Sequence, residues 1–186
     1  MAKLYTRTGD DGSTGLFGGD RVSKHSLRVT AYGHADETNA TVGMAVASCG
    51  DVESRLREIL LSIQSRLFDL GADLATPHDS PHADKVGRIT ADMVAQAERW
   101  IDEVDGDNAP MTSFVLPGGC ELASRLHLAR TVCRRCERSL SDLASREPCN
   151  EQALIWVNRL SDLLFAMARA ANRLHGVEDI PWHPAD

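Results

Sequence analysis

Apolar side chains recur at steps of three and four along much of the chain, the period of a helix that buries one face. The clearest run covers residues 56–74. The same period predicts helices at 93–104, 122–143 and 154–168. The stretch 29–47 is rich in Ala and Gly, which favours a helix that its neighbours can approach closely. No alternation of useful length predicts a strand, so the expected fold is all-α.

The segments between the predicted helices are short and polar. Thr90 is a good N-cap for the third helix, residues 76–87 read as a surface loop, and Pro148 separates the last two helices. Short connections favour antiparallel neighbours, so we expect a five-helix up-and-down bundle. We expect one domain, 1–186, made of a glycine-rich N-terminal loop (1–28), the bundle (29–175) and a polar tail (176–186).

Composition restricts the function classes. The chain carries 20 Lys and Arg against 27 Asp and Glu, a net charge of −7. This balance disfavours a general nucleic-acid binder but allows a local basic pocket. The sequence lacks a membrane-length apolar run and a secretory signal at its start, so we expect a cytoplasmic protein that binds no membrane. The five cysteines are expected to be free thiols.

Three arginines spaced by four, Arg130, Arg134 and Arg138, share one side of the predicted fourth helix, and we call them the arginine stripe. Like charges at this spacing repel each other slightly, so an anionic partner is expected. One interpretation is a solvated basic face with acidic neighbours. The other is a clamp for phosphate or carboxylate, which suits the planar guanidinium group.

The predicted fifth helix carries polar residues on one face at steps of four and three. Asn and Asp have low helix propensity in a helix interior, so their presence calls for a reason. They either form an exposed polar face, or Asn158 and Asp162 face Arg134 and Arg130 across a helix pair. The residues on this face are Asn158, Asp162, Phe165, Arg169 and Asn172.

The N-terminal segment from Tyr5 to Lys24 mixes glycines with Thr, Ser and Asp. Glycines let backbone N–H groups converge on an anion, and Arg7, Arg21 and Lys24 add positive charge. The segment lacks the Gly-Lys-Ser/Thr of a Walker A loop and the preceding strand of a dinucleotide fingerprint. It is therefore either an unusual anion-binding loop or a flexible tail.

Other reactive side chains form no recognisable site. Cys133 and Cys136 match C-x-x-C, but they fall in mid-helix without a second ligand pair, so core thiols are expected. The seven histidines are scattered without metal-ligand spacing, and no nucleophile elbow is present.

Taken in order along the chain, four blocks resemble the PduO-type ATP:cob(I)alamin adenosyltransferases, over nearly the whole length. Four blocks at suitable spacings are far more specific than any one of them. The blocks are Tyr5–Lys24, Tyr32–Asn39, Phe114–Gly119 leading into Ala129–Arg138, and Trp156–Phe165.

The resemblance implies a five-helix bundle that assembles as a homotrimer with active sites between subunits. It implies that Arg130 pairs with Asp36 across the interface, that Phe114 lies under the corrin, and that these three act with Arg134 in catalysis. The residues implied to contact ATP are Thr6, Arg7, Thr8, Gly9, Thr14, Gly15, Lys24, Arg134, Arg135, Cys136, Glu137, Arg138 and Asn158.

The implied reaction makes cob(I)alamin the nucleophile, which attacks C5′ of ATP and releases triphosphate, so no protein nucleophile is required. The implied substrates are ATP and cobalamin, and Mg²⁺ on the triphosphate needs no confident protein ligand. A flavin-type reductant and an adenosylcobalamin-dependent client enzyme are the expected partners besides the trimer itself, and nucleic acid is not expected.

Two other classes stay open from the sequence. One is a regulatory protein that binds ATP without turnover, and the other is a helical scaffold without a ligand. The sequence also departs from the family pattern at His25, His34 and Cys136, and His34 is close enough in sequence to Asp36 to affect its pairing.

Overall fold

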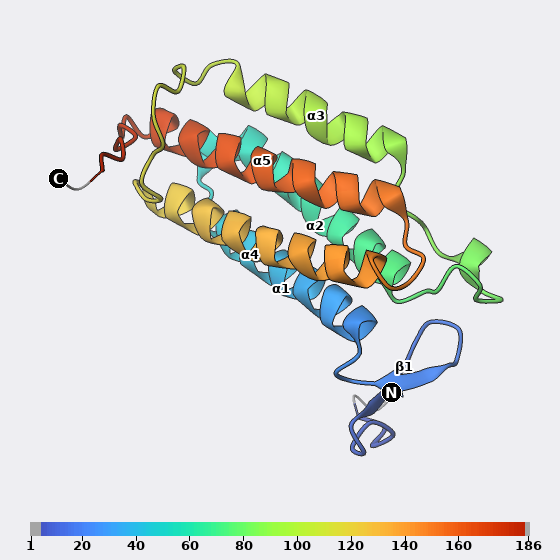
Figure 1. Cartoon of the computed structure of the whole chain (residues 1–186). Coiled ribbons are helices and arrows are strands. Elements are labelled where there is room, and N and C mark those ends of the chain that lie inside the picture. The colour runs from blue at the N-terminus through green and yellow to red at the C-terminus, as the bar shows by residue number, and fades with distance from the viewer. Residues whose placement is uncertain (1–4, 185–186) are drawn as a thin grey trace.

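The computed structural model describes residues 5–184, and it confirms the five predicted helices (Figure 1). Two short 3-10 turns, Asp51–Glu53 and Ala83–Lys85, lie in the connections before α2 and α3. The helices are α1 (Leu27–Ala47), α2 (Ser54–Leu74), α3 (Ala91–Asp105), α4 (Glu121–Ala144) and α5 (Glu151–Leu174).

Polar side chains fix where the helices begin. The Thr90 hydroxyl accepts from the Met93 N–H, as predicted for an N-cap. Ser26 does the same for α1, which therefore starts two residues before the predicted Val29.

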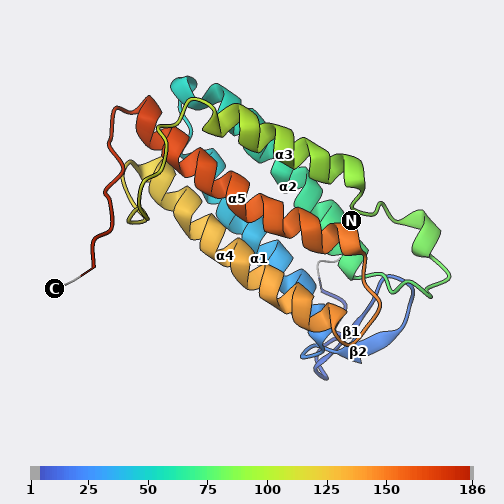
Figure 2. The same cartoon turned by 45° about the horizontal axis from the view of Figure 1, so that its top comes forward.

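The core follows the predicted apolar faces. Full burial of one Leu or Ile stabilises the fold by about 1.5–3 kcal/mol. The α2 side chains at steps of three and four are all buried, namely Leu56, Ile59, Leu60, Ile63, Leu67, Leu70 and Leu74. On α1 the buried apolar residues are small, including Ala31, Ala35 and Ala45, which lets α1 pack closely on both α2 and α4. α3 packs mainly on α5 and lies on the outside of the bundle (Figures 1 and 2).

The N-terminal loop contains a small hairpin that the sequence did not predict. Strand β1 (Ser13–Gly15) pairs antiparallel with β2 (Arg21–Ser23), and Thr14 lies opposite Val22. Figure 2 shows both strands beside the end of the bundle where α4 ends. Three-residue strands are too short to produce a visible alternation, so the sequence pattern predicts only a loop here.

The N-terminal loop and the connection between α3 and α4, which contains Phe114, lie at opposite ends of the bundle (Figure 1). Arg28 at the start of α1 pairs with Glu147 just after α4, which places the loop at the C-terminal end of α4. Phe114 precedes the N-terminus of α4. A helix of 24 residues is about 36 Å long. One chain therefore keeps these two elements well apart.

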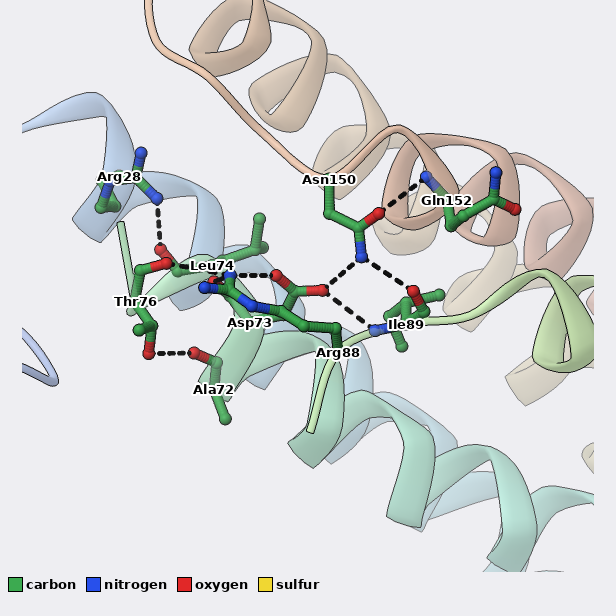
Figure 3. Close-up of polar contacts among 9 residues, drawn as sticks. All are labelled: Arg28, Ala72, Asp73, Leu74, Thr76, Arg88, Ile89, Asn150 and Gln152. Atoms are coloured by element: carbon green, nitrogen blue, oxygen red, sulfur yellow. Dashed lines mark hydrogen bonds and ion pairs between the residues drawn. The ribbon is translucent and has the colours of Figure 1, made fainter. Parts of the chain in front are cut away.

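A buried polar network joins the elements at the loop end (Figure 3). Asp73 Oδ1 accepts from Arg88 Nη1 at 2.6 Å, and its Oδ2 accepts from Asn150 Nδ2 at 2.7 Å and from the Ile89 N–H at 3.0 Å. Asn150 also caps α5 by accepting from the Gln152 N–H. The network ties the end of α2 to both neighbouring connections.

Among residues 5–184, no helix combines the length and apolar character needed to cross a bilayer.

Candidate functional site

The arginine stripe lies on α4 without carboxylate partners. Elsewhere on or just after this helix, Arg125, Arg135 and Arg146 each pair with an acidic side chain. None of the three stripe arginines forms an ion pair with any residue that the structure describes. Surface arginines in this chain usually find a carboxylate, so the unpaired stripe favours the anion clamp over a face with acidic neighbours.

An open pocket of about 350 Å³ lies beside the stripe, between α3, α4 and α5. Arg130 and Arg134 line it together with Asp162, Phe165 and Arg169. Asp162 thus shares a pocket with both arginines, as the second interpretation of the α5 face predicted. Asn158 differs, because its Nδ2 donates to Glu137 Oε1 on α4 at 2.8 Å.

Arg130 is the most buried residue of the stripe. Its guanidinium carbon lies 5.9 Å from the centre of the Phe165 ring, and its Nε is buried without a hydrogen-bond partner in the described chain. Burial, and then the charge of Arg134, lower the pKa of Arg130. An arginine held this way would gain from an anion or carboxylate brought from outside the chain.

Asp36, the expected partner of Arg130, faces a different groove. It lines a hollow between α1 and α2 with Tyr32 and Phe68, and its side chain is exposed. Arg130 lines the pocket beside α5. The two residues make no ion pair within one described chain, so the intersubunit pair stays a prediction.

The N-terminal loop brings several expected ATP ligands together. The Thr6 and Thr8 hydroxyls are 2.8 Å apart, and Lys24 Nζ donates to the Gly9 carbonyl at 2.7 Å. Arg7 has a φ of 63°, a left-handed conformation that a non-glycine residue rarely adopts, and its guanidinium lies over the Tyr5 ring. Strained backbone of this kind clusters at binding sites.

The hairpin contacts the start of the N-terminal loop through Arg21. Arg21 on β2 donates to the Thr8 carbonyl and to the Ser13 hydroxyl. The two remaining expected ligands, Thr14 and Gly15, lie on β1 in the same hairpin. The hairpin turn touches the rest of the protein through the Phe17 N–H, which donates to the Ala75 carbonyl at 3.1 Å.

Three residues on or beside α4 have different surroundings within one chain. The Cys136 side chain is buried, with its Sγ 4.0 Å from the Ala31 carbonyl, and its contact with ATP stays a prediction. Arg135 turns toward α1 and pairs with Glu37. His34 bonds to Ser139 on α4 at 2.6 Å instead of approaching Asp36. Consecutive helix residues point in directions about 100° apart, so the side chains of this block do not all lie on one face of α4.

Phe114 is exposed, at 76 % of its surface, in the segment between α3 and α4. The C-terminal tail pairs with this segment through an isolated bridge between Val115 and Pro181. An aromatic ring in a connection between helices often covers the end of a bundle, but a ring as exposed as that of Phe114 does not do so.

The sequence alone does not reveal the polar residues that hold this segment. Spacing places Arg169 and Asn172 on one face of α5 but assigns them no contact. Nothing local marks Asp179 in the tail as a partner for residues on α5.

Comparison with known proteins places the chain in a family. The model of the cobalamin adenosyltransferase family matches residues 4–171. A cobalamin adenosyltransferase of Cupriavidus metallidurans is 42% identical over 182 residues, covering 98% of this chain and 95% of its own. A corrinoid adenosyltransferase of Mycobacterium leprae is 43% identical, covering 99% and 97%.

Solved structures agree. A phenylalanine-to-alanine variant of a PduO-type ATP:corrinoid adenosyltransferase from Lactobacillus reuteri, complexed with cobalamin and ATP, matches with a TM-score of 0.93 and 38% identity over 98% of this chain and 100% of that chain. An arginine-to-lysine variant complexed with ATP matches with a TM-score of 0.89 and 39% identity, over 97% and 100%. The chain therefore belongs to the cobalamin adenosyltransferase family, and within it resembles the PduO type.

Proposed function

We propose that this chain transfers the 5′-deoxyadenosyl group of ATP to the cobalt of cob(I)alamin and releases triphosphate. The cobalt donates the electron pair that forms the Co–C5′ bond, and the C5′–O bond breaks with its electrons going to triphosphate. The observation that carries the proposal is the unpaired arginine stripe beside an aromatic-lined pocket in a chain of this family.

The protein's main task in this reaction is electrostatic. Negative charge grows on the leaving triphosphate, and Arg134, Arg138 and Lys24 are cations without carboxylate partners in the described chain. Preorganised cations of this kind stabilise a transition state without reorganising solvent. Triphosphate oxygens and the Thr6 and Thr8 hydroxyls are the hard ligands that Mg²⁺ prefers, and Mg²⁺ would neutralise part of the same charge.

The two ends of one chain are too far apart to form one site. The N-terminal loop and Phe114 flank a helix of 24 residues, about 36 Å long. The proposed site therefore combines the loop of one subunit with the α4–α5 pocket of another, in a homotrimer whose Asp36 and Arg130 pair across the interface. Sedimentation tests this, because a monomer with full activity contradicts both the trimer and the shared site.

Phe114 has a separate role in the proposal. It fills the space under the corrin, so that the lower axial ligand leaves the cobalt and Co(II) becomes easier to reduce. Loss of an axial donor raises the reduction potential. The free thiols of the chain fit a cytoplasmic setting, in which a flavin-type reductant supplies the electron and a client enzyme receives the product.

The decisive assay mixes the protein with ATP, Mg²⁺ and chemically reduced cobalamin and follows the corrin spectrum for a Co–C bond. Formation of that bond at a catalytic rate supports the proposal. Binding of ATP without bond formation favours the regulatory protein, and binding of neither substrate favours the scaffold.

Replacement of Phe114 tests its role. Because the ring is exposed, Phe114→Ala should leave the melting temperature and ATP binding nearly unchanged. Activity should fall strongly when the assay starts from Co(II) and should be partly restored when Co(I) is supplied. Electron paramagnetic resonance of Co(II)alamin with ATP reports the four-coordinate state directly, and an unchanged signal in the variant would contradict the role.

A further inference from the structure

The segment that carries Phe114, residues 109–119, is held at both of its ends by two buried side chains of α5. Arg169 holds the start of the segment, because its Nη2 donates to the Ala109 carbonyl at 2.6 Å. Asn172 holds the other end, because its Nδ2 donates to the Gly118 carbonyl at 3.2 Å and its Oδ1 accepts from the Cys120 N–H at 3.0 Å.

The packing at Asn172 is tight. Gly119 has a φ of 106°, which L residues rarely adopt, and a Cβ added there would lie 2.0 Å from Asn172 Oδ1. The backbone can approach the amide this closely only because residue 119 is a glycine. The end of the segment therefore has one well-defined position against α5.

Asp179 in the C-terminal tail bonds to both of these α5 side chains. Its Oδ2 accepts from Arg169 Nε at 2.8 Å and its Oδ1 accepts from Asn172 Nδ2 at 3.1 Å, so one carboxylate bridges both anchors. Arg169 and Asn172 are almost fully buried, so leaving either without its partners would be costly.

Beyond Asp179, the tail reaches Phe114 itself. The Trp182 N–H donates to the Phe114 carbonyl at 2.7 Å, and the Leu116 N–H donates to the Ile180 carbonyl at 2.8 Å. The Phe114 ring is mostly exposed and is held by few side-chain contacts. Its position is therefore set by the backbone, through the anchors at both ends of the segment and the tail in the middle.

We propose that Asn172, Arg169 and Asp179 are positioning residues that hold Phe114 at the height needed to displace the lower ligand of cobalamin. The inference rests on the proposed function of Phe114. It assigns the three residues to one step, the formation of four-coordinate Co(II), and not to ATP binding, because their contacts lie at the end of the bundle opposite the N-terminal loop (Figure 1).

The test compares Asn172→Ala and Asp179→Ala with the neighbouring control Glu178→Gln. Glu178 is exposed and makes no hydrogen bond or ion pair to residues 5–184, so its variant should behave as wild type. Asp179 lies outside the helices, so its variant should fold even if Asn172→Ala does not. Paramagnetic resonance of Co(II)alamin with ATP, the KM for ATP and turnover from both Co(II) and Co(I) are measured for each.

Both test variants should lose most of the four-coordinate signal, and turnover from Co(II) should fall about tenfold or more, the scale expected when a reacting group is displaced. The KM for ATP and turnover from supplied Co(I) should stay close to wild type. A parallel fall of all these quantities would indicate a purely structural role and overturn the inference.

The same experiment separates two kinds of failure. If Phe114→Ala keeps the four-coordinate signal, the proposed role of Phe114 is wrong. If Phe114→Ala loses the signal but folded Asp179→Ala keeps it, Phe114 acts as proposed and the positioning inference is wrong.

Discussion

The two ends of the bundle use the same three residue types in opposite ways. At the loop end, an aspartate receives hydrogen bonds from Arg88 and Asn150, and at the Phe114 end Asp179 receives them from an arginine and an asparagine on α5. Asp73 is itself buried in the bundle, with 2 % of its side chain exposed, and its partners come from the connections. Asp179 comes from the tail, and its partners are buried in the bundle.

Because the aspartate is buried at one end and lies in the tail at the other, the two networks should differ in what their loss does to the protein. Removing a buried aspartate leaves the bundle with unpaired polar groups, whereas removing a tail aspartate frees the tail and the Phe114 segment. Asp73 makes no hydrogen bond to the described N-terminal loop. The two are connected through the end of α2, where the Phe17 N–H donates to the Ala75 carbonyl. The loop end is thus built for stability, and the Phe114 end for position.

The largest expected effect is on stability, from Asp73→Ala. The change removes the carboxylate that pairs with Arg88 and accepts from the Ile89 N–H and the Asn150 amide (Figure 3). Arg88 and Asn150 keep backbone carbonyl acceptors, but breaking a buried charged pair costs about 3–5 kcal/mol. Urea denaturation measures this loss directly.

The matched control is Asp69→Ala, one turn earlier on α2. Asp69 pairs with Arg66 near the surface, and such pairs contribute at most about 1 kcal/mol. Asp179→Ala should also cost less than Asp73→Ala. If Asp73→Ala and Asp179→Ala lower the free energy of unfolding equally, the proposed difference between the two ends of the bundle is wrong.

The next effect is on activity, from Arg134→Ala. Arg134 lies about midway along α4, outside both networks, so the variant should keep its helical content, its assembly and its resistance to urea. Loss of one contact made in the transition state costs roughly 3–4 kcal/mol, which is a loss of most turnover. Arg146→Ala, which removes an exposed pair with Asp142, is the control. Near-normal turnover of folded Arg134→Ala would remove this residue from the site.

The helices were predictable because burial leaves a periodic trace, as in the α2 face that the structure buries completely. The pocket was predictable in part, because the spacing of polar residues on α5 suggested that Asp162 faces Arg130 and Arg134, and all three line one pocket. Local spacing gave no access to contacts between distant segments. Asp179 meets Arg169 only after the chain turns back at Gly176, which has a φ of 66°.

Adjacent residues of one sequence block can have very different surroundings on a helix. Arg134, Arg135 and Cys136 follow one another, yet the first is exposed, the second pairs with Glu37 and the third is buried in the core. The small hairpin was missed for a different reason, because its strands are held by backbone pairing and by Arg21, and neither depends on an apolar pattern.

The smallest predicted effect is a pH dependence that belongs to the Phe114 half of α4. His127 is buried there, edge-on to the Phe165 ring with the ring centres 5.9 Å apart. Burial first, and then the charge of Arg130, lower the pKa of His127 below its ordinary 6.5. The unfolded chain therefore binds a proton on this histidine more readily than the folded chain does, so stability is lost as the pH falls through 6.5 and is retained above it. Urea midpoints of His127→Gln should decline less steeply than those of wild type below that pH. The slope is the readout and not the absolute stability, because the substitution also changes packing against Phe165. An unchanged slope in His127→Gln would mean that this histidine titrates alike in both states, and that the Phe114 end contributes no acid sensitivity through it.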